Sequence, residues 1–342
     1  MNHKSTDPRR LPTLDDVAAV AGVGRGTVSR AINGAPNVSA RSQAAVMAAV
    51  EALGYVPNKA ARSLVTRRND SVTLVISESE ERFFSDPFFA AAVRGITGAL
   101  AGTSQTLLLT MVQAAEQHRA LENYLMSQHV DGVMMMSLHG QDPLPERLES
   151  RGLPVVLGGR PPDGVQVSYV DVDNVAGARD AVCHLLERGR RRIAVIGGPV
   201  DMAASADRMS GYVLAHKEFD VSLDTDLTEP GDFTEEGGRA AMRALLERAP
   251  DIDAVFAASD LMAAGALREL DRCNRKVPTD VALVGFDDAP VARHTQPQLT
   301  TVHQPIEAMG RAMAELLLAR IEGRPAQSHE LLSTHLVVRE SS

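Results

Sequence analysis

Apolar residues near the N-terminus recur every three or four positions, which is the spacing of short amphipathic helices. One stripe runs through residues 17–21 and a second through 28–32. Gly22 and Gly24 lie between them, and glycine is the usual residue where a helix ends in a tight turn. A third stripe follows over 39–53 and ends before another glycine. The pattern predicts three short helices around one small core.

Past residue 70 the pattern changes to short runs of β-branched and apolar residues, separated by longer helix-like segments. Such alternation predicts parallel sheets covered by helices. Two such halves, joined by crossing strands, leave a cleft at the carboxyl ends of the strands, where open α/β sheets bind ligands. The predicted strands lie within 71–77, 105–112, 131–137, 153–159, 192–198, 253–259 and 281–288.

The net charge of −9 is divided unevenly along the chain. Residues 1–68 hold ten Lys and Arg against four Asp and Glu, a balance of +6, so the remainder, with 25 basic and 40 acidic residues, carries −15. A basic head on an acidic body suits a nucleic-acid-binding module whose body is repelled by phosphate. The alternative is a solvated basic tail.

Several functional classes find no support in the sequence. No apolar run approaches the ~20 residues that cross a bilayer, and no apolar segment of a secretory signal follows the basic N-terminus, so we expect a cytoplasmic protein. Cys183 and Cys273 lack the spacing of a redox or metal motif, and no histidine pair has metal-ligand spacing. GxSxG, HExxH and Walker motifs are absent. We therefore expect no enzyme activity, no cofactor and no metal.

The glycines at 22, 24 and 26 admit a second interpretation, a dinucleotide-binding loop. Such a loop follows a strand and opens the helix of a βαβ unit, whereas here a helix capped by Thr13 precedes it. We prefer the DNA-binding interpretation, in which the second helix places its N-terminal side chains against base edges in the major groove.

The segment 13–64 carries the motifs DVA, AGV, TVSR, VS, LGY and PN in this order. In motifs and spacing it resembles the DNA-binding region of the LacI/GalR family of transcription regulators. The family's usual Ser after AGV is Gly24 here, so the start of the second helix lacks a side chain that relatives carry.

The resemblance implies which head residues contact DNA. Arg25 and Gly26 occupy the two base-reading positions of the recognition helix, and Arg30 a further groove-facing one. Because Arg donates bidentately to O6 and N7 of guanine, we expect a guanine opposite Arg25 in each operator half-site. Thr27, Ser29 and Asn33 fit phosphate contacts or helix caps better than base contacts. The expected DNA contacts are Thr13, Arg25, Gly26, Thr27, Ser29, Arg30, Asn33, Asn58, Lys59, Ala61 and Leu64.

Residues 58–68 are expected to form a hinge between a helix-turn-helix head, 11–57, and a body, 70–342. About two helical turns fit into this segment, too few to be stable alone in water, so its folding is expected to need DNA and a second copy. The resemblance makes Leu64 a wedge that enters the minor groove. The alternative is that Leu64 packs on the body.

The resemblance extends to the body, which is similar to the periplasmic-binding-protein-like core of the same regulators. The expected fold is therefore an all-α helix-turn-helix head followed by an α/β core of two doubly wound parallel-sheet lobes. We expect the first lobe to contain residues about 70–170 and 303–325, and the second about 171–302 and 326–342.

Polar and aromatic residues follow the predicted strands, residues 171–174 among them, and for any single Asp a helix cap or turn is an equal alternative. The resemblance implies that Arg208 clamps a ligand, Phe233 stacks on a sugar ring and Asp287 accepts from hydroxyls. Gly159 stands where many members carry an Asp, which leaves room for a disaccharide. The expected effector contacts are Asp86, Phe88, Arg160, Arg208, Phe233, Ser259, Asp287 and Gln304.

The motifs DPFF, GGRPP, VSYVDVDN and GDFTEEG resemble cellobiose-responsive regulators of actinobacteria. A homodimer on palindromic operator DNA is implied, released when a sugar closes the lobes and melts the hinge helices. Cellobiose or a related disaccharide is the expected effector, with maltose and xylobiose as alternatives. The alternative of an exported sugar-binding protein would account for the body but not for the DNA-binding head. A hydrolase using Asp287 and Asp288 fits poorly, because adjacent residues on a strand face opposite ways.

Overall fold

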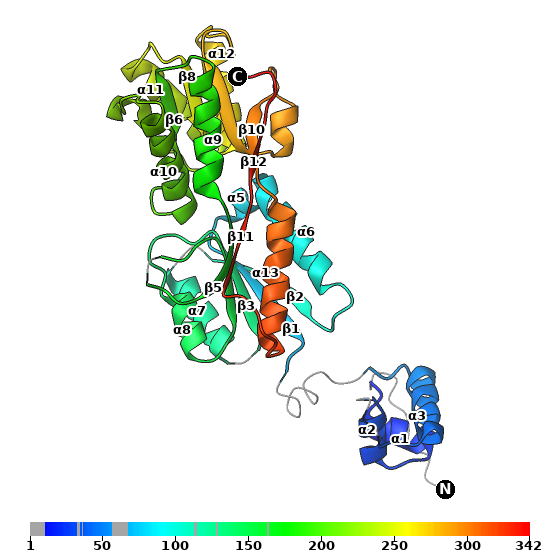
Figure 1. Ribbon diagram of the computed structural model, residues 1–342. Helices are drawn as coiled ribbons and strands as arrows, with labels where there is room; N and C mark the ends of the chain where they lie inside the picture. Colours follow the sequence, from blue (N-terminus) through cyan, green and yellow to red (C-terminus); the bar gives the residue numbers. More distant parts are fainter. Residues whose placement is uncertain are drawn as a thin grey trace. The chain divides into compact units, whose positions relative to one another are not determined.

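The computed structural model describes residues 11–32, 35, 37–56, 68–112, 115–127, 129–162 and 164–342. The chain divides into two compact units, Met1–Asn69 and Asp70–Ser342, which we call the head and the body (Figure 1). Among the described residues, no helix is both long enough and apolar enough to cross a membrane.

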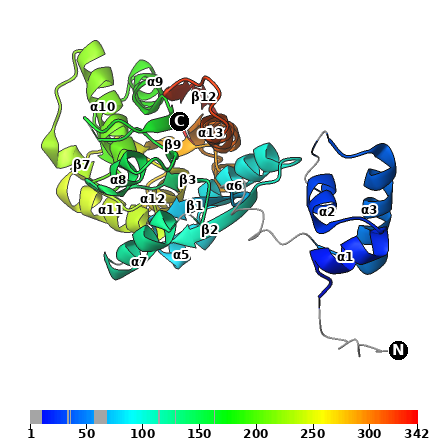
Figure 2. The ribbon, with the colours of Figure 1, turned by 90° about the horizontal axis from the view of Figure 1, so that it is seen from below.

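The head is the predicted set of three short helices around one small core (Figure 2). Val17, Val28 and Val46, one from each helix, are fully buried. The Thr13 side chain caps the first helix, as its sequence position predicted, and Gly22, with φ of 68°, ends it in the left-handed conformation that glycine adopts without strain. The helices are α1 (Leu14–Ala21), α2 (Arg25–Ile32) and α3 (Ala40–Leu53).

The first lobe of the body is a six-stranded parallel sheet in the order β11-β5-β4-β3-β1-β2. Helices α6 and α13 bury Phe89 and Met313 on one face, and α7 and α8 bury Leu125 and Leu148 on the other (Figure 1). The strands are β1 (Ser71–Ile76), β2 (Thr106–Met111), β3 (Gly132–Met136), β4 (Val155–Gly158), β5 (Ser168–Val172) and β11 (His329–Leu332). The helices are α5 (Glu80–Ser85), α6 (Pro87–Leu100), α7 (Ala115–Met126), α8 (Leu144–Ser150) and α13 (Ile306–Ile321).

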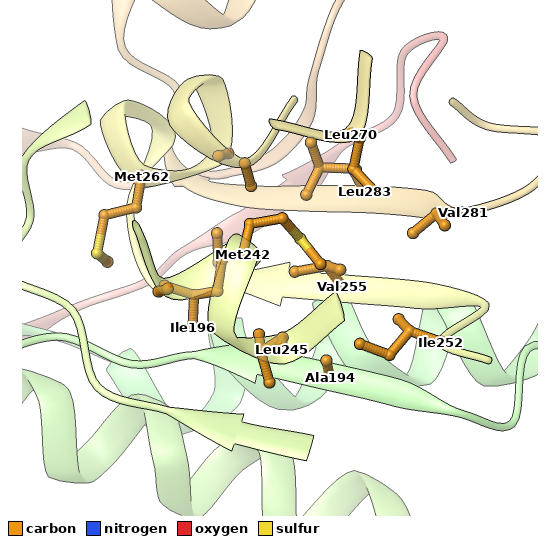
Figure 3. Packing of buried hydrophobic residues seen from close by; sticks show 14 of the residues in the cluster. Ala194, Ile196, Met242, Leu245, Ile252, Val255, Met262, Leu270, Val281 and Leu283 are labelled. Carbon is orange, nitrogen blue, oxygen red and sulfur yellow. The ribbon is translucent and has the colours of Figure 1, made fainter. Parts of the chain in front are cut away.

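The second lobe is a six-stranded sheet in the order β12-β10-β9-β8-β6-β7, parallel except for β12. Helices α9 and α10 bury Leu185 and Tyr212 on one face, while α11 and α12 bury Met242 and Leu270 on the other (Figure 3). The strands are β6 (Ile193–Ile196), β7 (Thr228–Glu229), β8 (Ala254–Ala257), β9 (Ala282–Asp287), β10 (Thr300–His303) and β12 (His335–Val337). The helices are α9 (Asn174–Glu187), α10 (Ala203–Glu218), α11 (Glu235–Arg248) and α12 (Asp260–Arg272), with the 3-10 turns η1 (Thr225–Leu227) and η2 (Pro290–Arg293).

The chain crosses between the lobes three times, after β5, after β10 and after β11. The expectation that 326–342 belongs to the second lobe is wrong for β11, which pairs in parallel with β5, Glu330 opposite Val170. Helix α13 returns the chain along the first sheet, so the strand that follows runs parallel to β5 and extends the sheet at its open edge. Only the part from β12 onward joins the second sheet.

Helices α6 and α13 of the first lobe touch backbone to backbone. A Cβ atom at Gly95 would lie 1.9 Å from the Glu307 carbonyl oxygen, and one at Gly310 would lie 2.2 Å from that of Ala92. Both distances are far below van der Waals contact, so a larger residue at either glycine would push the helices apart. The two glycines therefore fix α13, which begins just after the second crossing, to α6.

Candidate functional site

Helix α2 turns one face to the core of the head and the other to solvent. Val28 is fully buried, whereas Arg25, Gly26 and Arg30 are exposed. The Arg25 guanidinium lies 3.7 Å from the carboxylate of Asp15, and both side chains are about two-thirds exposed. An exposed ion pair of this kind contributes little energy, so Arg25 can exchange it for another acceptor. The exposed face is the one on which base-reading residues were predicted.

The remaining predicted DNA contacts of the head have different surroundings. The hydroxyl of Thr13 donates to the Asp16 carboxylate at 2.6 Å, so this side chain serves the helix cap. Thr27 and Ser29 are half-buried on α2. A Cβ atom at Gly26 would meet nothing within 4 Å, so the position has room for a side chain that it does not use. Asn33, Asn58, Lys59, Ala61 and Leu64 lie outside the described residues.

A cavity of about 90 Å³ lies between the lobes of the body, where segments that follow strands of both sheets meet. This volume is well below the ~300 Å³ at which typical ligand pockets begin, so a two-ring sugar requires the lobes to move apart. Part of its lining also lines a wider groove of about 720 Å³. Seven of the eight predicted effector contacts line the cavity: Asp86, Phe88, Arg208, Phe233, Ser259, Asp287 and Gln304.

Arg208, on α10, places a positive charge in this cavity and is only 5% exposed. Its Nε donates to Oδ1 of Asn174 at 2.9 Å, and its Nη1 donates to the carbonyl of Ala258 and lies 3.6 Å from Oδ1 of Asp287. The guanidinium also lies over the ring of Phe286, 3.8 Å from the centroid. Burial lowers the pKa of Arg208, and the nearby carboxylates oppose this shift.

Carboxylates outnumber the guanidinium in this region. Burial raises the pKa of Asp86, Asp171, Asp260 and Asp287, because a buried carboxyl group loses the hydration of its charged form. For Asp287 the burial outweighs the attraction of Arg208 and raises the pKa to about 7. The site therefore combines one fixed donor with several acceptors whose charge depends on pH, and such a set can bond the hydroxyls of a polyol.

Some of these aspartates also serve as helix caps or structural links, the alternative that the sequence left open. Asp86 is both a cap and a cavity residue, since it accepts from the N–H of Phe88 at 2.9 Å and also lines the cavity. Asp260 is fully buried and accepts from the hydroxyl of Thr301 at 2.6 Å and from the N–H of Ala289 at 2.7 Å. Asp260 therefore joins α12 to β10, directly after the lining residue Ser259.

The adjacent residues Asp287 and Asp288 have positive φ angles, 114° and 53°, and their side chains have separate partners. Asp287 accepts from Nε2 of Gln304 at 2.5 Å in the cavity. Asp288 accepts from Arg339 and lies 3.2 Å from Nδ1 of His303. Strained backbone of this kind is concentrated at functional sites. The two carboxylates do not form a pair around one reacting group.

The ring of Phe233 is buried against charged groups of both lobes. The guanidinium of Arg82, from the first lobe, lies 5.1 Å from its centroid, and that of Arg208, from the second, lies 5.7 Å away. Such cation–π contacts hold a flat apolar surface beside the polar groups of the cavity. A ring face next to hydrogen-bonding groups is what a sugar requires, because its C–H side is apolar and its rim is hydroxylated.

Arg160 is the one predicted effector contact whose side chain does not line the cavity as the structure describes it. Its Nη2 lies 2.5 Å from the carboxylate of Asp207 on α10, and its side chain is 44% exposed. Its backbone N–H, by contrast, donates to Asp171 at 3.0 Å. Arg160 thereby links the first lobe to α10 of the second.

Nine lining residues were absent from the predicted contacts, and five of them show what the sequence could and could not report. Asp171 and Asn174 lie in the strand-end segment 171–174, whose polar residues were noted, and Ser137 ends a predicted strand run. These three had a signal in the sequence. Met202 and Met309 had none, because an apolar residue beside a helix start is indistinguishable from ordinary core.

Family models match both units. Residues 13–58 match "Bacterial regulatory proteins, lacI family", and 182–342 match a "Periplasmic binding protein-like domain". A curated relative, the HTH-type transcriptional regulator CelR of Thermobifida fusca, is 53% identical over 97% of this chain and 99% of its own.

Solved structures agree over nearly the full length. A "transcriptional regulator CelR-cellobiose complex" is 51% identical, with a TM-score of 0.78 over 97% of this chain and all of its own. The lac repressor dimer bound to operator and the anti-inducer ONPF is 25% identical, with a TM-score of 0.86 over 97% of this chain and 99% of its own. The predicted helix-turn-helix head and two-lobe α/β core are confirmed. The chain belongs to the lacI family of bacterial regulatory proteins.

Proposed function

We propose that this protein is a DNA-binding repressor of carbohydrate-utilisation genes, released from a palindromic operator by cellobiose or a related disaccharide. One observation carries the proposal: the likeness over 97% of the chain to a regulator solved with cellobiose, at 51% identity. The charged and aromatic lining of the cavity supports it. The protein acts in the cytoplasm as a homodimer and catalyses no reaction.

The effector in this proposal is a neutral polyol held between the lobes. Arg208 donates to ring or hydroxyl oxygens, Asp287 and Asp86 accept from hydroxyls, and Phe233 covers the C–H side of one ring. A Cβ atom at Gly159 would meet nothing within 4 Å, so space remains beside these residues. That space, together with the adjoining wider groove, offers room for a second ring once the lobes have opened.

On the DNA side, each protomer places α2 in the major groove of one half-site. Arg25 reads a guanine with its two terminal nitrogens, and Arg30 supports it from the same exposed face. Leu64 of each hinge enters the minor groove at the centre of the operator. Effector binding changes the spacing of the two hinges and thereby releases the operator.

Operator binding of the full chain, followed by fluorescence anisotropy at fixed salt concentration, tests this function. Cellobiose, maltose and xylobiose are titrated into the complex, and we expect release by cellobiose at the lowest concentration. Release by maltose or xylobiose alone would replace the proposed effector. A complex that none of the sugars dissociates, or hydrolysis of cellobiose by the protein, would overturn the proposal.

A further inference from the structure

A small group of polar contacts joins the two lobes outside the cavity lining. His139 follows β3 in the first lobe, and Asp201 lies between β6 and α10 in the second. Nδ1 of His139 lies 3.0 Å from Oδ2 of Asp201, and the N–H of Gly140 donates to the Asp201 carbonyl at 2.9 Å. Both a side chain and the backbone therefore connect the lobes at this point.

The other side of the imidazole is fixed within the first lobe. Nε2 of His139 lies 3.2 Å from Oε1 of Glu78, whose side chain is 8% exposed. That carboxylate also accepts from the hydroxyl of Ser137 at 2.6 Å and from Arg82. Because Ser137 and Arg82 of the same lobe hold Glu78 in place, the imidazole keeps its orientation and presents Nδ1 to Asp201.

The contact lies far from the crossings about which the lobes move. In the first sheet, β3 is two strands away from β5, and in the second, β6 is three strands away from β10. With neighbouring strands about 4.8 Å apart, the contact lies roughly 10–14 Å from the crossing strands. A bond at this distance resists opening more effectively than one beside the crossings, since a small angle of opening already breaks it.

We propose that His139 and Asp201 form a latch that holds the lobes closed over the effector, so that two residues outside the cavity lining set the effector affinity. The inference rests on the proposed function, because the latch is defined by the ligand that the lobes enclose. His139 does not contact the effector in this proposal. It is a positioning residue that holds the second lobe through Asp201.

The charges around His139 give the latch a pH dependence. Glu78 and Arg82 face it from the segment after β1, Asp142 from the loop after β3, His118 from α7 and Asp201 from the opposite lobe. The hydrogen bond to Glu78, with that to Asp201, raises the pKa of His139. Opening removes Asp201 but keeps Glu78, so the closed form holds the proton more tightly. Closure is therefore favoured below the pKa of His139 and weakens as pH rises through it.

Calorimetric titration of the full chain with cellobiose between pH 6 and 8.5 tests the latch. Asp201→Asn should bind about fivefold more weakly at pH 6 and show a smaller change of affinity with pH than wild type. His139→Asn keeps a hydrogen-bond donor but carries no charge. It should therefore bind cellobiose more tightly than Asp201→Asn and more weakly than wild type at pH 6, and its affinity should likewise change less with pH. Asp251→Asn removes the same charge from the second lobe, where Asp251 pairs with Arg192 of its own lobe, and should behave as wild type.

A second measurement does not depend on the effector. NMR titration of the ligand-free protein, with the His139 signal assigned from His139→Asn, should show a lower imidazole pKa in Asp201→Asn than in wild type. Wild-type affinity and pH profile in Asp201→Asn, or an unchanged imidazole pKa, would overturn the latch. If wild type does not bind cellobiose at all, the proposed effector is wrong. The NMR titration would then still show whether His139 and Asp201 interact.

Discussion

Replacement of Asp287 by Asn tests the electrostatics of the cavity through the stability of the body. Burial raises the pKa of Asp287 from 3.8 to about 7. A group whose pKa is higher in the folded than in the unfolded chain contributes stability that is complete below the unfolded pKa and is lost as pH rises through the folded pKa. Ionisation of Asp287 therefore opposes folding increasingly between about pH 4 and pH 7.

The size of the effect follows from the shift. Each unit of pKa difference corresponds to about 1.4 kcal/mol, so the wild type should lose up to about 4 kcal/mol of its free energy of unfolding over this interval through Asp287. The figure is an upper bound, because neighbouring carboxylates such as Asp260 also take up protons. Asn has nearly the same shape and does not ionise, so Asp287→Asn should have the flatter profile and be the more stable protein at pH 8.

Urea unfolding of the full chain, followed by circular dichroism between pH 4.5 and 8, provides the measurement. Asp288→Asn is the matched control: burial acts to raise the pKa of Asp288, but the hydrogen bond from Arg339 prevails and lowers it. Its contribution is present above the unfolded pKa and is lost only as pH falls through the folded pKa, below this interval. Asp288→Asn should therefore lower the free energy of unfolding by the same amount at every pH between 4.5 and 8. Parallel profiles of Asp287→Asn and wild type would refute the reasoning.

Three further substitutions test other parts of the chain. Arg25→Ala should weaken operator binding by about 1–3 kcal/mol and relax the base preference at one position, which single-base operator variants measure, and an unchanged preference would contradict its role. Arg208→Met should leave operator binding near the wild-type level while the anisotropy assay shows no release by cellobiose, and retained release would exclude Arg208 from the site. A Cβ atom at Gly265 would lie 1.9 Å from the carbonyl oxygen of Glu235, so Gly265→Ala should separate α11 from α12 and cost about 1–3 kcal/mol in thermal unfolding, and an unchanged melting temperature would contradict this packing.

The sequence pattern located the strands that form continuous apolar runs and missed the five other strands, which lie at or next to a sheet edge. All seven predicted runs contain a strand of the structure. β5 (SYVDV) and β10 (TTVH) contain polar residues, β7 has two residues, and β11 and β12 are partly exposed, so none of the five leaves a continuous apolar run in the sequence. Edge strands are specified by the partner beside them, and the place of β11 in the first lobe followed from pairing that local pattern does not record.

The candidate site was predictable where a residue follows a strand and unpredictable where its partner lies in the other lobe. Asp287 and Ser259 end or follow strands whose apolar runs were clear. Arg160, by contrast, pairs with a carboxylate 47 positions away, and His139 contacts Asp201 across 62 positions. Such contacts depend on the angle between two lobes, and no spacing or composition within either lobe reports that angle.

The glycine contact between α6 and α13 determines how a ligand acts on the first lobe. Asp86 caps α6, Gln304 lies just before α13, and both line the cavity. Because Gly95 and Gly310 bring the two helices into backbone contact, we expect α6 and α13 to move together. In the proposed function, we therefore expect a ligand that contacts both residues to rotate the first lobe as one rigid body, and the angle of that rotation to be what reaches the rest of the chain.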